Sequence, residues 1–306
     1  MSALRQALAD YLAVRRVLGY RLARAEKLLA QFLAYLEARG ESRLTIEAAL
    51  AWATLPGDAD RGWLSARLSV VRCFAIYLRG IDPATEIPPP DLLPGRTCRA
   101  TPYLYSEEDI AALMTAAAAL RTPHHVATYR TLIALLWVSG MRVGEAIGLD
   151  RDDFDPTSGL LTIRNGKLGK SRSLPLHPTT VSALGDYLRR DDRPSARTSA
   201  LFVSTAGTRL RYANVQSTFH RSVHRARLAP RSAACRPRLH DLRHAFALRS
   251  LLDAYGDGSD PAIRLTLLST YLGHVDPGKT YWYLSAAPEL LALAGERLER
   301  HLGGGA

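Results

Sequence analysis

The chain has 306 residues, with 40 lysines and arginines against 29 aspartates and glutamates, which gives a formal net charge of +11. A composition that is 47% hydrophobic and 23% charged is typical of a folded protein, and it excludes a disordered, collagen-like or coiled-coil chain. The length corresponds to about two ordinary domains.

Apolar runs and cysteine spacing bear on where in the cell the protein is expected. No apolar run reaches the roughly 18 residues that a membrane helix needs, so we expect no membrane partner. Arg5, Asp10, Arg15 and Arg16 interrupt the first twenty residues, which therefore lack the apolar centre of a secretory signal. The three cysteines form no C-x-x-C pair, which argues against a disulfide framework or a zinc ribbon. These features predict a cytoplasmic protein.

The N-terminal part of the chain predicts a bundle of four short helices, over residues 1–82. Apolar residues share one face of a first helix: Leu4, Leu8, Tyr11, Leu12 and Leu18. A second apolar face covers 28–36 and ends at Gly40, and a third, short helix begins at about Thr45. A fourth helix carries a stripe over 64–78.

A proline-rich segment separates this bundle from the rest of the chain. Residues 83–105 contain six prolines and no periodicity, which is typical of a semi-rigid extended spacer. Ser106, with Asp109 three positions later, resembles a capping box at the start of a helix. We therefore expect a second domain over 106–306.

The second domain is predicted to be mainly helical, with one β-hairpin. Residues 159–164 and 171–176 alternate as strands do, and Asn165-Gly166 between them is a turn dipeptide. Lys167 and Lys170, two of only four lysines in the chain, fall on the hairpin tip. Two lysines on one turn suggest a mobile ammonium group that reaches over a phosphate, whereas a solvated loop tip is the commoner explanation of any single lysine there.

Charge is concentrated in one segment. Residues 209–249 contain ten arginines and a single acid, Asp241. A one-sign segment repels itself unless it faces a polyanion, and nucleic acid is the common polyanion for such a protein. A genome biased toward arginine codons explains the shortage of lysine but not the missing acids. The pattern therefore favours DNA as a partner.

Arg142 follows a very apolar helix and a Ser139-Gly140 turn, in the stretch SGMRVGEAIGL. Glu145, three positions later, can hold its guanidinium. Taken alone, this spacing favours an ordinary intrahelical ion pair.

The stretch LHDLRH at 239–244 places three donors, His240, Arg243 and His244, on one helical face. Such a set calls for an anion. Zinc binding in the H-E-x-x-H manner is disfavoured because Arg243 would put a cation beside the metal. A structural role explains His244 better than a catalytic one.

Residues 267–284, LLSTYLGHVDPGKTYWYL, predict a helix that ends at Gly273, followed by His274, an Asp-Pro-Gly turn and two tyrosines. A histidine just past a helix end can point into a cleft, and a surface histidine is an equally good interpretation. Tyr281 and Tyr283 lie two positions apart, about 200° around a helix, so only one of them faces the same site as His274.

The order and spacing of these stretches resemble the tyrosine site-specific recombinases, a family that includes the phage integrases and the Xer-type resolving enzymes. The matching stretches are MRVGEAIGL, GKLGKSRSLPL, HDLRHAFA and LLSTYLGHVDPGKTYWY. The YWYL ending is most similar to recombinases of mobile elements. The resemblance covers essentially the whole chain. It implies a mainly α fold with a small β-sheet, made of an N-terminal four-helix core-binding (SAM-like) domain and a C-terminal catalytic domain.

The resemblance also implies six catalytic residues, which are Arg142, Lys167, His240, Arg243, His274 and Tyr283. Tyr283 is preferred to Tyr281 because the family's tyrosine lies nine positions after the histidine of its L-G-H box. Met141 replaces a usual leucine, and Pro277-Gly278 is unusual in the turn before the tyrosine. Neither departure removes a catalytic group.

For such an enzyme the resemblance implies that the tyrosine attacks a DNA phosphodiester and stores it as a 3′-phosphotyrosyl bond, without ATP, a metal or another cofactor. The two arginines neutralise charge on the phosphate oxygens, His240 accepts the phenolic proton and Lys167 protonates the leaving 5′ oxygen. The implied partners are double-stranded DNA and further copies of the chain in a homotetrameric synapse, with or without companion recombinases. The implied process is integration, excision or transposition of a mobile element.

Three other interpretations stay open. A relaxing topoisomerase shares the chemistry, but the small N-terminal bundle disfavours it. A catalytically silent, sequence-specific DNA-binding regulator would need the basic surface but not the intact set of catalytic residue types. A zinc hydrolase is the remotest alternative.

Overall fold

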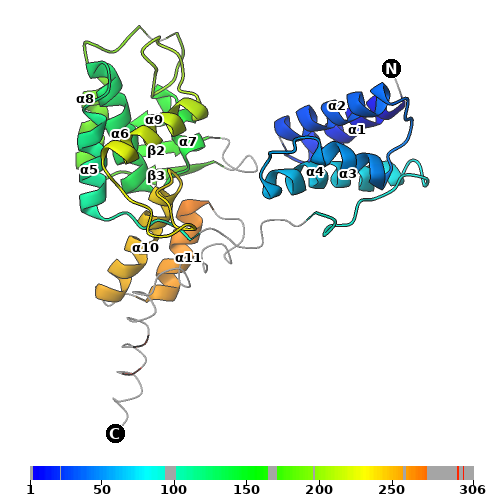
Figure 1. Ribbon diagram of the computed structural model, residues 1–306. Coiled ribbons are helices and arrows are strands. Elements are labelled where there is room, and N and C mark those ends of the chain that lie inside the picture. Colours follow the sequence, from blue (N-terminus) through cyan, green and yellow to red (C-terminus); the bar gives the residue numbers. More distant parts are fainter. Residues whose placement is uncertain are drawn as a thin grey trace. The chain divides into compact units, whose positions relative to one another are not determined.

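The computed structural model describes residues 3–20, 22–93, 101–164, 171–195, 197–257, 260–273, 295 and 299 (Figure 1). The chain divides into two compact units, residues 1–99 and 100–306. Within the described part of the chain, no helix has the length and apolar character that crossing a membrane requires.

The first unit is the predicted four-helix bundle. Its helices are α1 (Ala3–Val17), α2 (Ala23–Ala38), α3 (Ile46–Thr54) and α4 (Arg61–Arg79). Thr45 caps α3 by accepting a hydrogen bond from the Ala48 amide, which confirms the predicted start of the third helix. Fully buried Phe32, Phe74 and leucines form the core. One detail of the prediction is wrong: Leu18 is 63% exposed, because α1 ends before it.

The described parts of the predicted semi-rigid spacer form contacts with the neighbouring units. The Glu86 carboxylate accepts a hydrogen bond from the Ile46 amide at 2.7 Å, and Arg72 donates to the carbonyls of Pro88, Pro89 and Pro90. At the other end, Tyr103 and Tyr105 are buried in the core of the second unit. These contacts attach residues 86–90 to the first unit and Tyr103 and Tyr105 to the second.

The second unit is mainly helical with a small sheet, as expected. Its elements are α5 (Glu107–Ala117), α6 (Pro123–Ser139), α7 (Val143–Gly148), the 3-10 turn η1 (Arg151–Asp153), β1 (Phe154–Asp155), β2 (Leu160–Ile163), β3 (Arg172–Pro175), α8 (Pro178–Leu188), α9 (Tyr212–Arg225), α10 (Asp241–Gly256) and α11 (Pro261–Leu272). The apolar helix α6 packs against α5, α8 and α10. The predicted capping box at Ser106 and Asp109 opens α5.

The sheet has the order β1-β2-β3, and both pairs are antiparallel. The β2-β3 pair is the predicted hairpin, in which Leu161 lies opposite Leu174 and Ile163 opposite Arg172. Strand β1 has two residues, too few for an alternation that a sequence pattern could reveal. The hairpin tip, with Lys167 and Lys170, lies outside the described residues.

Candidate active site

A tight reversal after α6 positions Arg142. Gly140 caps α6 in the left-handed conformation, with φ of +57°, and Arg142 then stands at the N-cap of α7. A Cβ atom at Gly140 would lie 2.3 Å from Cδ1 of Phe246 on α10. Only glycine therefore satisfies both the backbone conformation and the close approach of α10.

Glu145 holds Arg142 in two ways. Its Oε1 accepts a 2.8 Å hydrogen bond from Arg142 Nη1, and its Oε2 accepts one of 2.9 Å from the Arg142 amide. Burial alone would raise the pKa of Glu145, but hydrogen bonds from Arg172 and Arg142 outweigh it and hold that pKa at about 2. The carboxylate is therefore charged at neutral pH and fixes the start of α7.

Arg172 is the second partner of Glu145, and sequence reasoning did not identify it. From β3, its Nη1 and Nη2 donate to the two carboxylate oxygens at 3.1 and 2.8 Å, and its Nε donates to the Tyr271 carbonyl at 2.9 Å. The signal in the sequence was the strand alternation, which places Arg172 on the same face as buried Leu174. An arginine on the inward face of a strand needs a buried acid.

Arg243 on α10 joins the ends of two helices. It is 2% exposed, and it donates from Nη1 to the Gly140 carbonyl at 2.9 Å and from Nη2 to the Leu272 carbonyl at 2.6 Å. Those carbonyls terminate α6 and α11, where the helix dipoles concentrate negative charge. The guanidinium therefore lies between the turn that leads to Arg142 and the turn that leads to His274.

The two histidines of the LHDLRH stretch differ in exposure. His240, at the N-cap of α10, is exposed, whereas His244 is 7% exposed. Their rings meet edge to face with centroids 5.0 Å apart, as the predicted shared helical face requires. Asp241 between them is buried, accepts hydrogen bonds from Arg238 and the Tyr103 amide, and has a pKa raised chiefly by burial. It anchors the start of α10.

Three of the six predicted catalytic residues, Lys167, His274 and Tyr283, lie outside the described residues, as does Tyr281. Their described neighbours in sequence are tied together. Gly273 ends α11 as predicted, with φ of +66°, and a Cβ atom there would lie 3.0 Å from Nη1 of Arg172. The end of α11, the β3 strand and the start of α7 thus meet at the Arg172 guanidinium.

The basic segment 209–249 contains two kinds of arginine. Four are bound within the second unit to carboxylates or backbone carbonyls: Arg209, Arg238, Arg243 and Arg249. Six are exposed: Arg211, Arg221, Arg225, Arg227, Arg231 and Arg236. Two of these six, Arg225 and Arg231, also donate to the carbonyls of Ala119 and Leu104. Counting charges along the sequence cannot separate these groups, because the partners include distant groups such as Asp150 for Arg209 and the Gly140 and Leu272 carbonyls for Arg243. Among the described residues, no group of three or more His, Cys, Asp or Glu side chains could hold a metal ion.

Comparisons with known proteins bear on this arrangement. The model of the Phage integrase family matches residues 104–289. A Sinorhizobium fredii protein named as an integrase/recombinase, y4rB, is 44% identical over 308 residues, which cover 98% of this chain and 98% of that protein.

Two solved structures share the fold. The Tn1549 transposon integrase in complex with transposon right-end DNA has a TM-score of 0.64 at 16% identity, over 97% of this chain and 99% of that one. The λ integrase tetramer bound to a Holliday junction has a TM-score of 0.58 at 18% identity, over 92% and 76%. The full-length relative and the family match reach further than fold: this chain belongs to the phage integrase family of tyrosine recombinases, site-specific enzymes that break and rejoin DNA.

Proposed function

We propose that this recombinase cleaves DNA with Tyr283, assisted by Arg142, Lys167, His240, Arg243 and His274. The phenolic oxygen attacks the phosphorus, the bond from phosphorus to the 5′ oxygen breaks, and a 3′-phosphotyrosyl bond remains. The released 5′-hydroxyl of the same or an exchanged strand later reverses the step. The bond energy is conserved throughout, so the reaction needs no ATP.

The observation that carries this proposal is the bonding that orients the two arginines. Glu145, which Arg172 also binds, holds Arg142, and carbonyls at the ends of α6 and α11 hold Arg243. Preorganised guanidiniums suit a pentacoordinate phosphorus because its non-bridging oxygens gain negative charge in the transition state. Removing one such donor is expected to cost about 3–4 kcal/mol in the barrier, by analogy with oxyanion-hole deletions.

Proton transfer is assigned to the remaining residues. A phenol with a pKa of about 10 is protonated at neutral pH, so attack requires a base. His240 is exposed at the start of α10 and takes the phenolic proton, while Lys167 protonates the departing 5′ oxygen. His274 adds a hydrogen bond to the phosphate.

The proposed organisation follows from the same assignment. Residues 1–82 form a core-binding domain, 83–105 connect it, and 106–306 form the catalytic domain. Double-stranded DNA is the substrate, held through its phosphates, and four copies of the chain form the synapse, as in the solved λ integrase tetramer on a Holliday junction.

A mobile element is the proposed context, because the y4rB relative is named as an integrase and the Tn1549 integrase belongs to a transposon. A DNA substrate agrees with the cytoplasmic location that the sequence predicts.

A suicide oligonucleotide tests the proposal. The full chain is incubated, in EDTA, with a nicked duplex that carries the DNA sequence flanking its gene, so that the cleaved 5′ fragment diffuses away. The expected result is a covalent protein–DNA band that Tyr283→Phe abolishes and Tyr281→Phe retains.

The other outcomes identify the alternatives. A band that survives in Tyr283→Phe and disappears in Tyr281→Phe assigns the nucleophile to the other tyrosine. Specific DNA binding without any covalent band, for the wild-type chain, identifies a silent regulator. Cleavage that leaves no protein adduct, and that occurs in a parallel reaction without EDTA but not with it, identifies a metal-dependent hydrolase.

A further inference from the structure

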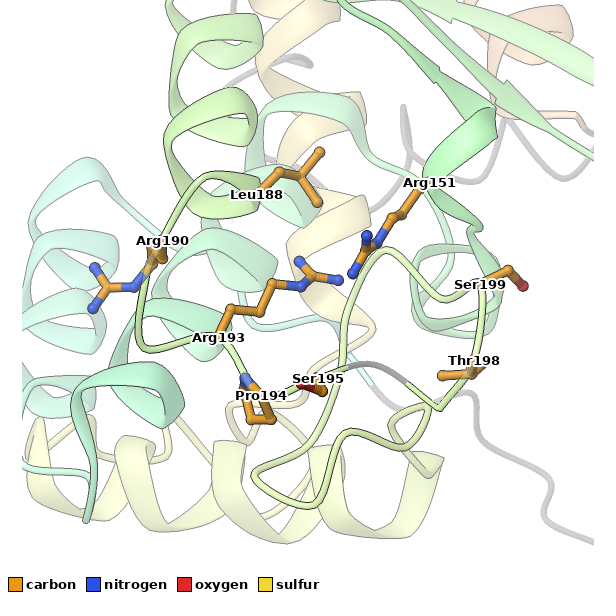
Figure 2. Close-up of a pocket in the computed structure, with 8 residues that line it drawn as sticks. All are labelled: Arg151, Leu188, Arg190, Arg193, Pro194, Ser195, Thr198 and Ser199. Atoms are coloured by element: carbon orange, nitrogen blue, oxygen red, sulfur yellow. The ribbon is translucent and has the colours of Figure 1, made fainter.

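A pocket lies in the second unit away from the candidate active site. Described residues of the loop that follows α8, together with Leu188 at the end of α8 and Arg151 of η1, line an open pocket of about 470 Å³ (Figure 2). The connection from α8 to α9 lies at the end of the unit opposite α10 and α11 (Figure 1). Neither Glu145 nor the proposed catalytic arginines line this pocket.

Arg193 lines the pocket and is held in place by contacts with the rest of the unit. Its Nη2 donates to the carbonyls of Ala200 and Leu201 at 3.1 and 3.0 Å, and its guanidinium lies over the Tyr187 ring, 5.1 Å from the centroid. These contacts fix the group in one place. Its Nε and Nη1 are buried and have no hydrogen-bond partner in the described structure. A buried donor without a partner destabilises the fold.

A second guanidinium faces the first. The side chain of Arg151 points toward that of Arg193 in Figure 2, and the two are close enough that their charges repel. Neither forms an ion pair with any carboxylate of the described residues, whereas Arg190 at the pocket edge pairs with Asp192 at 2.7 Å. Unsatisfied donors and unopposed positive charge therefore meet at one point of the wall.

We propose that this pocket binds a phosphate-class oxyanion between Arg151 and Arg193. An oxyanion opposes both charges and matches the forked geometry of a guanidinium. Ser195 and Thr198 add hydroxyl groups to the lining. The volume exceeds that of one phosphate ion, so the pocket can admit the oxyanion either as free phosphate or as a phosphodiester of DNA. This site is independent of the catalytic proposal.

Titration with inorganic phosphate tests the site. The full ¹⁵N-labelled chain is titrated with sodium phosphate at constant ionic strength, maintained with sodium chloride, while the arginine Nε–H resonances are followed. We expect a saturable shift of Arg193, a titration midpoint at least tenfold higher in Arg151→Gln, and an unchanged midpoint in Arg189→Gln. Arg189 is a matched control, because it is exposed beside the pocket and does not line it.

The Arg151→Gln substitution is not expected to change the stability of the fold, so a changed titration midpoint reports on phosphate binding. The Arg151 side chain is exposed and has no hydrogen bond or ion pair with the described residues, so Arg151→Gln should unfold at the wild-type temperature. A shift that never saturates, or an Arg151→Gln midpoint equal to that of the wild type, overturns the proposal.

A duplex of arbitrary sequence distinguishes the two sources of phosphate. If the natural occupant is a DNA phosphodiester, the duplex displaces inorganic phosphate, and Arg151→Gln weakens duplex binding more than Arg189→Gln does. If the occupant is free phosphate, the titration midpoint is the same with and without saturating duplex. Either result supports an oxyanion site, and loss of strand cleavage in Tyr283→Phe would leave both unaffected.

Discussion

At the scale of single residues, Glu145 holds two guanidiniums of the candidate active site in place. One carboxylate accepts hydrogen bonds from two guanidiniums and one backbone amide while 7% of its side chain is exposed. Taken from its sequence alone, the Arg142–Glu145 spacing favoured an ordinary intrahelical ion pair, and that pair exists. What makes it more than ordinary is Arg172, which arrives from a strand 27 residues away.

The pH dependence of stability tests the role of Glu145. The folded-state pKa of about 2 lies below the usual 4.5, so the carboxylate stabilises the fold above pH 4.5, and this contribution is lost as the pH falls toward 2. We expect Glu145→Gln to lower the unfolding free energy at pH 6 by roughly 3 kcal/mol. Denaturant unfolding between pH 6 and 2 should show the gap to the wild type closing; a gap of constant size would contradict this account.

Arg172 is expected to act on catalysis through Glu145 rather than through the phosphate. Arg172→Lys keeps the charge but loses the forked contact, so Arg142 loses its fixed orientation. We expect the rate of covalent adduct formation to fall about 100-fold, the order of effect of a misplacement of about 1 Å. The DNA dissociation constant should match that of the wild type and of the control Arg189→Lys. A parallel loss of binding and rate would instead indicate a general structural defect.

At the scale of elements, the site exists because helix ends and one strand converge. The last carbonyls of α6 and α11 are usually satisfied by solvent or caps. Here Arg243 binds one from each helix, and Arg172 binds the Tyr271 carbonyl of α11. Gly140 and Gly273 make the convergence possible, because both are left-handed caps with a side chain of another element against them.

Substitution of Gly140 tests the tight approach of α10 to the α6 cap. We expect Gly140→Ala to lower the unfolding free energy by at least about 2 kcal/mol, from left-handed strain and overpacking together. Phe246→Leu should relieve only the overpacking, so a double-mutant cycle should show favourable coupling between the two positions. Additive effects in that cycle would show that the Phe246 ring does not limit the space at position 140.

At the scale of the whole molecule, the basic residues behind the net charge of +11 have two roles. Some arginines of the segment 209–249 hold the fold together, and six are exposed to solvent. Only the exposed group is expected to contact DNA phosphates and release counterions.

Salt dependence measures that use of charge. Arg211 is exposed at the start of α9, so Arg211→Gln should weaken binding to all duplex sequences alike and reduce the slope of log K against log salt by about 1. Arg189→Gln removes the same charge elsewhere and should leave the slope unchanged. Equal slopes in both variants would mean that net charge, rather than a particular surface, determines binding.

The sequence by itself determined the helices of the first unit, the β2-β3 hairpin, the capping box at Ser106, the end of α11 at Gly273 and the family. All of these depend on patterns within a few residues, or on motifs whose order in the chain is informative. Only the tertiary structure decided that Arg172 shares Glu145 with Arg142, that Arg243 bridges two helix ends, and which arginines are exposed. The physical reason is that a charged side chain acquires its role from the partner that neutralises it, and folding brings those partners from distant parts of the chain.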